Sequence, residues 1–316
     1  MLKSPLLYLL LFITILSCNK KDSNSESEGK TKKLSVKALK TITVYSSFGE
    51  AHNQFLERGF INLKNKLALQ KNIQETSGLN FNITNNNENT DPIRELSLDI
   101  ASEELEVMVD SVFSTEEIRE LLDDNMPDYM DMITYSSTFD MLYQNNATTN
   151  LTNVFLNSIS DLDDVLEDCS NYSDSINIFN RLDNLILTYD NLLSNELEKE
   201  VFIGACILTK YSLRYWAKNE NTLRNIVLPY QNEIKSEFNI TAPPTTITFY
   251  KANPVTSDVR GMVVGGITGG IRGGIWGSGI PGIGTAAGAI SGAILGSAFS
   301  GATGSLTSGI RKILGF

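Results

Sequence analysis

The chain has 316 residues and a formal net charge of −11, and it contains three cysteines and one histidine. The negative charge argues against a nucleic-acid partner, because phosphate binding requires clustered lysine and arginine, and no basic patch studded with aromatic residues occurs. Three cysteines are too few for a fold that is built on disulfide bonds.

The first residues are organised like a bacterial secretory signal. Lys3 supplies a positive charge, residues 6–16 form an apolar run, and a small residue precedes Cys18. The apolar run is shorter than the ~20 residues that span a bilayer as a helix. Residues 15–18 (ILSC) resemble the lipobox that lipoprotein signal peptidase recognises. The resemblance implies that residues 1–17 are removed and that Cys18 is acylated and anchors the protein in a membrane.

A polar segment follows Cys18. Residues 19–33 are almost free of apolar side chains, so they cannot bury enough surface to offset the entropy of the chain. We therefore expect a flexible tether over residues 18–41. Residues 19–22 (NKKD) resemble the export signals of Bacteroidota surface lipoproteins, which implies the outer membrane of the cell envelope rather than the inner membrane.

Helical periodicity dominates the middle of the chain, which we predict to be an acidic all-α domain over residues 42–240. Ser47 and Glu50 have the spacing of a capping box, which predicts a first helix of about 25 residues. Asp91 followed by Pro92 predicts that a second helix begins there and runs to about residue 109.

Later segments of this domain repeat the helical pattern. A capping box at residues 114–117 predicts a short helix that stops near Pro127. Apolar residues at helical spacing predict three further helices, the last of them capped by Ser194: residues 151–167, 176–193 and 196–218. We expect the aromatic residues of the last helix to be core and surface side chains, namely Tyr211, Tyr215 and Trp216.

Cysteines and acidic residues in these helices raise two alternatives. Cys169 and Cys206 could form a disulfide in an oxidising envelope or remain free and buried, and the sequence leaves both open. The acidic residues of 161–164 and 167–168 lack the glycine turn and the ligand spacing of a calcium loop. We expect them to form a solvated helix face rather than a metal site.

His52 is the only histidine, which limits the chemistry available. Zinc needs several ligands, whereas a catalytic triad needs one histidine beside a nucleophile and an acid. We expect a packing or capping contact on a helix, and catalysis would require His52 in an open cleft, bonded to a hydroxyl and a carboxylate. Residues 48–56 (FGEAHNQFL) are similar to a Gly-x-x-His-Asn-x-x-Leu stretch near the start of many Bacteroidota lipoproteins. This resemblance supports the envelope location and implies no mechanism.

The C-terminal part differs sharply in composition from the acidic middle. Pro243, Pro244 and Pro254 interrupt helices, so residues 241–256 are expected to be an extended linker. Of the 23 glycines in the chain, 18 lie between Gly261 and Gly315.

These glycines recur every four residues in two series: Gly261, Gly265, Gly269, Gly273 and Gly277, then Gly284, Gly288, Gly292 and Gly296. A turn signal at residues 277–282 (GSGIPG) lies between the series. The pattern predicts a glycine-zipper helical hairpin over residues 257–310, followed by a basic and apolar tail over residues 311–316. Because glycine costs ~1 kcal/mol relative to alanine in an exposed helix, close helix packing must compensate.

This segment resembles the glycine-zipper two-transmembrane domain of bacterial outer-membrane lipoproteins of the seventeen-kilodalton surface antigen type. The resemblance implies contact with membrane lipid and self-association through the glycine faces. Arg272 opposes simple spanning, because a central arginine costs ~2.5–3.5 kcal/mol on insertion scales. Three alternatives therefore stay open: a membrane hairpin, a soluble zipper packed on protein, and a disordered or strand-forming tail.

Taken together, these features predict a lipid-anchored, non-enzymatic envelope protein with a membrane-associated or interaction role. Membrane lipid is the expected partner, through Cys18 and residues 257–310, and we expect no cofactor, metal or nucleic acid. One alternative is a pore-forming or antibacterial effector whose hairpins oligomerise in a target membrane, with Arg272, Arg311 and Lys312 favouring anionic lipid. A second alternative is an enzyme built around His52.

Overall fold

The computed structural model describes residues 34–78, 92–108, 137–144, 151–172, 175–237, 253–279 and 301–315. Within these ranges the regular structure is entirely helical, which confirms the predicted all-α class. Cys18 and the helix predicted after residue 114 lie outside the described residues.

The first long helix, α2, runs over Val36–Ser77 and begins earlier than the sequence predicted. Ser35, not Ser47, is its N-cap, and the Ser35 hydroxyl accepts a hydrogen bond of 3.0 Å from the backbone N–H of Ala38. The segment predicted as a tether therefore ends inside a helix. Residues 41–47 are rich in serine and in the β-branched residues threonine, isoleucine and valine, which weakens the local helix signal, and burial of side chains such as Tyr45 overrides it.

Helix α9, over Glu196–Val227, forms the centre of the fold. Its residues 201–209 are all buried, which is the pattern of a helix covered on every side. Helices α2, α8 and α11 all pack against it. Its N-cap is Asn195 rather than the predicted Ser194, because the Asn195 side chain accepts from the backbone N–H groups of Leu197 and Glu198.

Three of the remaining elements correspond to predicted helices, whereas α6, η2, η3 and α10 were not predicted individually, and α9 runs nine residues beyond its predicted end at residue 218. Helix α3 begins at Pro92, as predicted, and two predicted helices of the later region are present as α7 and α8. The bounds are α3 Pro92–Met108, α6 Thr138–Gln144, α7 Asn153–Leu166, η2 Glu167–Asn171, α8 Ser175–Tyr189, η3 Leu228–Tyr230 and α10 Gln231–Glu237.

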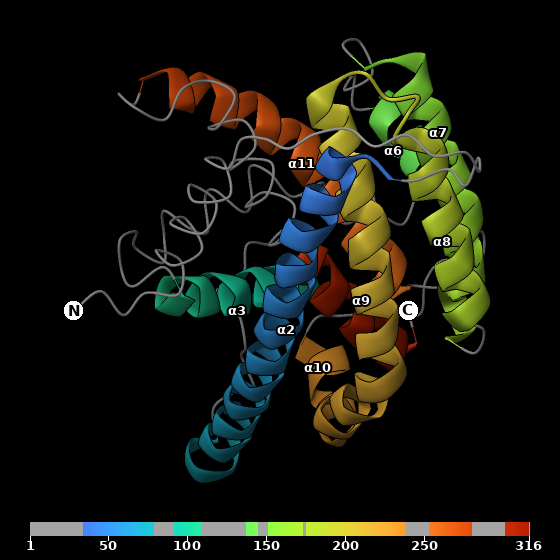
Figure 1. The fold of residues 1–316 in the computed structure, drawn as a ribbon. Coiled ribbons are helices and arrows are strands. Elements are labelled where there is room, and N and C mark those ends of the chain that lie inside the picture. Colours follow the sequence, from blue (N-terminus) through green and yellow to red (C-terminus); the bar gives the residue numbers. More distant parts are fainter. Residues whose placement is uncertain are drawn as a thin grey trace.

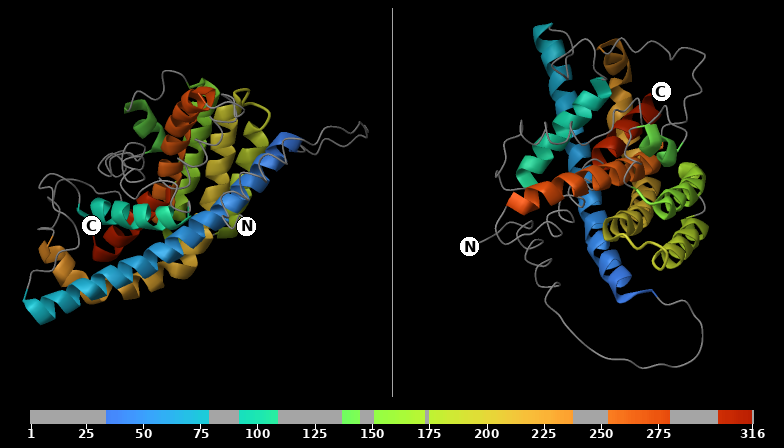
Figure 2. Two further views of the ribbon diagram at one scale, coloured as in Figure 1. Left: turned by 90° about the vertical axis from the view of Figure 1, so that its left-hand side faces the viewer. Right: turned by 90° about the horizontal axis from the view of Figure 1, so that it is seen from above.

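The helices form layers around α9. In Figure 1, α2 and α9 lie side by side, and α7 and α8 cover the side of α9 away from α2. Helix α3 crosses α2, as Figure 2 shows from two further directions. The arrangement brings residues from both ends of the chain to the centre of the bundle.

Helix α11, over Pro254–Gly279, starts inside the segment that was predicted to be a linker. Pro254 occupies the first helical position, where its missing N–H is not needed, and the Asn253 side chain accepts from the N–H of Val255 at 3.1 Å. The proline thus begins a helix instead of interrupting one. Residues 301–314 form a further helix, and Val263 of α11 and Leu306 of this last helix join the same apolar core as α2 and α9.

The part of the predicted zipper that can be followed side chain by side chain packs on protein. Residues 254–267 are buried apart from the half-buried Thr256, and residues 301–310 are all buried. Over the rest of α11 only the backbone is described, and Figure 1 shows it extending away from the labelled helices. Among the described helices, none combines the length and the apolar character needed to cross a bilayer.

Three buried or half-buried carboxylates accept hydrogen bonds from residues at the N-termini of other helices. Asp190 accepts from the N–H and the hydroxyl of Ser35, at 2.7 and 2.8 Å, and so holds the start of α2. Asp163 accepts from the backbone N–H groups of Thr138 and Phe139, both at 3.0 Å, and caps α6. Asp163 is therefore a capping residue and not part of the predicted solvated face. Glu198 accepts from the N–H of Thr152 at 2.8 Å, just before α7.

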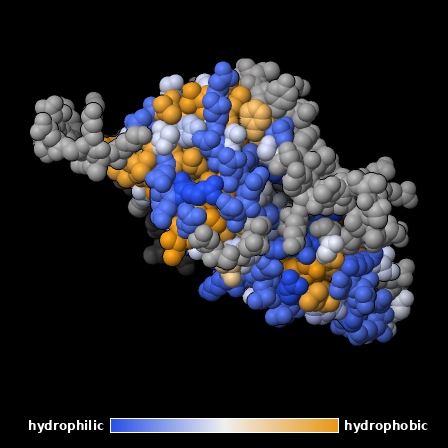
Figure 3. All heavy atoms as spheres, turned by 90° about the vertical axis from the view of Figure 1, so that its right-hand side faces the viewer, coloured by the Kyte–Doolittle hydropathy of each residue, from blue (hydrophilic) through white to orange (hydrophobic). Residues whose placement is uncertain are grey.

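The outer face around α7 and α8 is mixed in character. Figure 3 shows hydrophilic residues interrupted by separate hydrophobic patches on this side of the molecule. Ile176 at the start of α8 is one exposed apolar side chain, with 76% of its surface accessible. Scattered exposed apolar residues are normal for a protein surface, so this face by itself indicates no partner.

Candidate functional site

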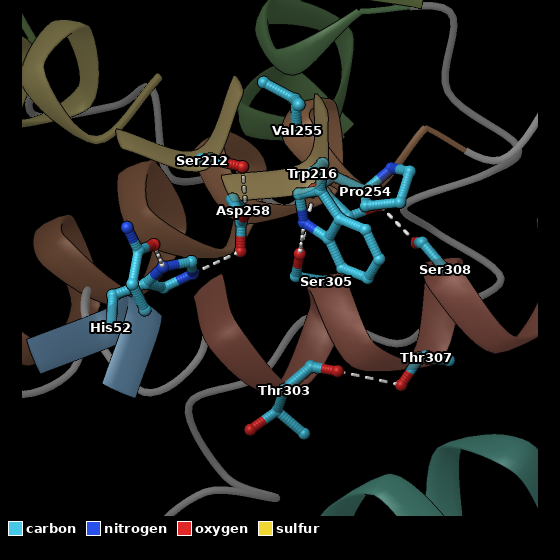
Figure 4. A network of polar contacts seen from close by, with 12 residues as sticks. His52, Ser212, Trp216, Pro254, Val255, Asp258, Thr303, Ser305, Thr307 and Ser308 are labelled. Carbon is cyan, nitrogen blue, oxygen red and sulfur yellow. Dashed lines mark hydrogen bonds and ion pairs between the residues drawn. The ribbon is translucent and has the colours of Figure 1, made fainter. Parts of the chain in front are cut away.

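The only histidine lies where α2 passes α9 and α11. Nε2 of His52 is 2.7 Å from Oδ1 of Asp258 on α11, and neither side chain has exposed surface. On the other side of the ring, Nδ1 is 3.1 Å from Oδ1 of Asn53. Ser212 of α9 donates its hydroxyl to Oδ2 of Asp258. Figure 4 shows this chain of contacts, which links three helices through one carboxylate.

The order of the groups differs from that of a catalytic triad. In a triad the histidine lies between the nucleophile and the acid, so that it can take the proton of the hydroxyl. Here the carboxylate of Asp258 lies between Ser212 and His52. The cluster is also sealed from solvent, because Ser212 is fully buried like its two partners. This geometry matches the predicted packing role of His52 and lacks the open cleft that hydroxyl activation requires.

The surroundings of His52 favour its protonated form. Burial lowers the pKa of His52, but the charge of Asp258 and the hydrogen bonds that the ring makes to Asp258 and Asn53 together raise it above its ordinary value. Both ring nitrogens face oxygen atoms, and only the imidazolium donates from both. While His52 is protonated, it forms a buried ion pair with Asp258.

Further polar contacts join α11 to the last helix. The indole N–H of Trp216 on α9 donates to the hydroxyl of Ser305 at 2.7 Å. Ser305 in turn donates to the backbone oxygen of Pro254 at 3.3 Å. Three positions later in each helix, the hydroxyls of Ser257 and Ser308 are hydrogen-bonded to each other. Small hydroxyl residues thus satisfy one another inside an otherwise apolar contact, as Figure 4 shows for this region.

Glycines allow the close approach of these helices. A Cβ at Gly301 would lie 2.8 Å from the backbone oxygen of Asp258, and one at Gly309 would lie 2.5 Å from Cη2 of Trp216. On α9, a Cβ at Gly204 would lie 2.3 Å from Cε of Met262 on α11. All three distances are shorter than a carbon atom permits. Glycine at these positions therefore serves helix contacts within this protein.

The predicted zipper series falls partly in this contact. Gly261 and Gly265 lie in the buried first half of α11, packed with the rest of the core. The next three glycines are helical in backbone, but their surroundings are not described: Gly269, Gly273 and Gly277. The second series lies outside the described residues: Gly284, Gly288, Gly292 and Gly296. The predicted hairpin over residues 257–310 therefore stays a prediction.

Two other predicted features can be placed. Cys169 and Cys206 are both free and buried, which resolves the disulfide alternative in favour of thiols. In the part of the chain that is described, no group of three or more histidine, cysteine or acidic residues is close enough to hold a metal ion.

Lys312 of the predicted tail contacts two other side chains, with Nζ 2.8 Å from Oε2 of Glu220 on α9 and 3.2 Å from the hydroxyl of Tyr172.

A groove of about 640 Å³ lies between α2 and the C-terminal half of α9. Phe60 and Tyr215 contribute to its apolar lining, and Glu57, Lys64 and Asn219 add polar groups. The described contacts give no converging set of polar atoms there that would select one ligand.

Sequence reasoning missed the partner of His52, although a signal was present. Asp258 is the only acidic residue within residues 253–279 and 301–315, a region of apolar and glycine residues. A carboxylate that is isolated in an apolar segment requires a hydrogen-bond or charge partner when it is buried, and the single histidine of the chain is one such candidate. The 206 residues that separate the two positions hide the pairing from any local pattern.

Comparison with models of known protein families, with curated proteins and with solved structures finds no match to this chain.

Proposed function

We propose that this chain is a lipid-anchored protein of the bacterial cell envelope, held at the outer membrane through Cys18, with a membrane-associated or interaction role that involves no catalysis. The lipobox-like residues 15–18 support the anchor. The glycine-rich segment that follows residue 253, part of which is buried in the helical domain, is the element we assign to that role.

The observation that carries this proposal is the close packing of the glycine-rich helices. Gly301 and Gly309 permit contacts that any other residue would block, so these helices are built for close helix association. The single histidine supports a role without catalysis. It is buried in the core, and the carboxylate of Asp258 lies between it and the hydroxyl of Ser212.

Metabolic labelling tests the anchor. Cells that express the full chain and receive a fatty-acid analogue should label the wild type and not the Cys18→Ala variant. The wild type should also fractionate with the outer membrane. Equal labelling of both proteins would refute lipidation at Cys18 and with it the proposed location.

A pore-forming or antibacterial effector is the second candidate function. It is favoured by one observation: apolar side chains of the glycine-rich helices, such as Val259 and Ile310, are stored inside a helical shell. If these helices left the shell, they could associate in a bilayer, where unpaired backbone groups find no water and helix is favoured.

Dye release from liposomes separates the two candidates. The mature chain with Cys18→Ser is added to vesicles of anionic lipid that hold a fluorescent dye. Binding with release that is lost in Gly269→Leu combined with Gly288→Leu would favour the effector. Binding without release would favour an anchored membrane or assembly element, and the absence of any binding would contradict both membrane roles of the glycine-rich segment.

A further inference from the structure

Asp258 holds together four parts of the chain. Its carboxylate binds His52 of α2 and Ser212 of α9, and the residue itself belongs to α11. Its backbone oxygen lies where the absence of a side chain at Gly301 leaves room for the last helix. No other described contact links the glycine-rich helices to α2 and α9 through a charged group at the same point.

A buried ion pair such as His52–Asp258 is seldom explained by a gain in folding stability alone. Burying two charges costs the free energy of their hydration, and their mutual attraction seldom exceeds that cost. Well-packed apolar residues at the same positions often give equal or greater stability. Removing the charge of one partner, in contrast, leaves the other as a buried and uncompensated ion, which is strongly unfavourable. A contact of this kind holds its elements together only while both groups are charged.

The groups that face the pair leave His52 as the one that titrates near neutral pH. The neighbouring residues on α2 and α9 that hydrogen-bond to the pair, Asn53 and Ser212, do not ionise in this range. Burial, with a smaller contribution from Asp258, raises the pKa of Tyr215 on α9 and of Tyr172 after η2, so both remain neutral.

The charged residues on the same elements act on other partners. Arg260 of α11 acts on Asp163 of α7, and Glu57 of α2 acts on Tyr215. In the last helix, Lys312 is paired with Glu220.

We propose that the His52–Asp258 ion pair is a pH-sensitive latch that holds residues 254–267 and 301–314 inside the helical domain and releases them when His52 loses its proton. The inference rests on the proposed function in one respect, because it gives the glycine-rich helices a stored state from which they can reach a membrane.

The direction of the switch follows from proton linkage. The pKa of His52 in the folded protein is raised above the ordinary histidine value of about 6.5, so the latch contributes fully below that pH and weakens as the pH rises through the folded pKa. For release coupled to one proton, the opening equilibrium rises about tenfold per pH unit between the pKa of His52 in the open state, about 6.5, and its pKa in the folded protein, and it levels off above the folded pKa.

Hydrogen–deuterium exchange of the whole mature chain, with Cys18→Ser to remove the lipid, tests the latch without any membrane. After correction for the intrinsic effect of pH on exchange, opening of residues 254–267 and 301–314 should increase about tenfold per pH unit between about pH 6.5 and the folded pKa, and level off above it. Residues 153–189, in α7 and α8, should remain protected over the same range. Loss of protection in α7 and α8 at the same pH would show general unfolding and overturn the proposal.

Two variants separate charge from packing. His52→Gln keeps a hydrogen-bond donor but cannot titrate, so opening of these segments should be greater at pH 6 and should no longer depend on pH. Ser308→Ala removes the Ser257–Ser308 hydrogen bond from the same contact and should weaken protection while it keeps the pH slope of the wild type. An unchanged pH slope in His52→Gln would refute the latch.

The wild type alone provides a second measurement in case His52→Gln does not fold. Because the chain has one histidine, a sample labelled with ¹³C in histidine gives one set of ring signals. The signal should titrate above about pH 6.5, with a midpoint at the pH where the opening stops rising. A midpoint at or below the ordinary value, or one unrelated to the opening, would contradict the proposal. Neither experiment uses lipid, so the latch can fail while the proposed anchor stands.

Discussion

Gly309 lies at the tightest contact between the last helix and α9, and adding one methyl group there tests how these helices pack. In Gly309→Ala the new carbon would lie 2.5 Å from Cη2 of Trp216 and 2.9 Å from Cδ2 of Leu223. Trp216 is fully buried, and its indole N–H is fixed by Ser305 of the same helix. The ring cannot move aside without weakening that hydrogen bond.

Gly59 provides the matched control, because it is a buried helical glycine with room around it. A Cβ at Gly59 would lie 3.5 Å from Cγ2 of Ile100 and 3.8 Å from Cδ2 of Leu306, which are ordinary contact distances. Both substitutions gain about 1 kcal/mol from the helix preference of alanine. Their difference therefore isolates the packing penalty at Gly309.

Overpacking of a filled core costs typically ~1–3 kcal/mol. Gly59→Ala should stabilise the protein by about 1 kcal/mol, and Gly309→Ala should be less stable than Gly59→Ala by about 1–3 kcal/mol. Urea unfolding followed by circular dichroism measures both, and thermal unfolding should separate them by about 2–4 °C per kcal/mol. Equal stabilisation by the two substitutions would refute the close packing of the last helix against Trp216.

Two further predictions concern the carboxylate at the start of α2 and the thiols. Burial opposes the charge of Asp190, but the hydrogen bonds from Ser35 and the nearby Lys199 lower its pKa, so its stabilisation is present above about pH 4 and is lost as the pH falls through the folded pKa. Asp190→Asn should therefore lower the free energy of unfolding by about 1–3 kcal/mol at pH 7, and a difference that persists undiminished at pH 2 would contradict this assignment. In the mature chain with Cys18→Ser, Cys169 and Cys206 should resist a maleimide reagent while the protein is folded, since burial raises the pKa of the Cys169 thiol to about 12, and mass spectrometry should find two labels only after denaturation. Rapid labelling of the native protein would place at least one thiol at the surface.

Local signals predicted the helices where sequence and packing agree. Pro92 began α3, and periodic apolar residues predicted α7 and α8, because caps and helical spacing act over a few residues. The start of α2 was predicted too late at Ser47, since burial of residues such as Tyr45 outweighs a weak local preference.

For the C-terminal segment, the sequence determined the need for close helix packing, and the structure determined the packing partners. The glycine spacing by itself determined that some helices must approach closely, because glycine is otherwise unfavourable in a helix. It did not determine which surfaces they approach. Gly301 meets the backbone of Asp258 on α11, within the same segment, whereas Gly309 meets Trp216 of α9, which comes from elsewhere in the chain.

The sequence also determined that one histidine and one isolated acid exist, but only the tertiary structure decided that they meet. His52 and Asp258 are brought within 2.7 Å by the packing of α2 and α11 on α9, across 206 positions of sequence. Burial and charge then act on the pair together, so its protonation depends on the whole core around it. A sequence pattern carries the identity of such groups, whereas their distance and their exclusion from water arise only when distant helices pack against each other.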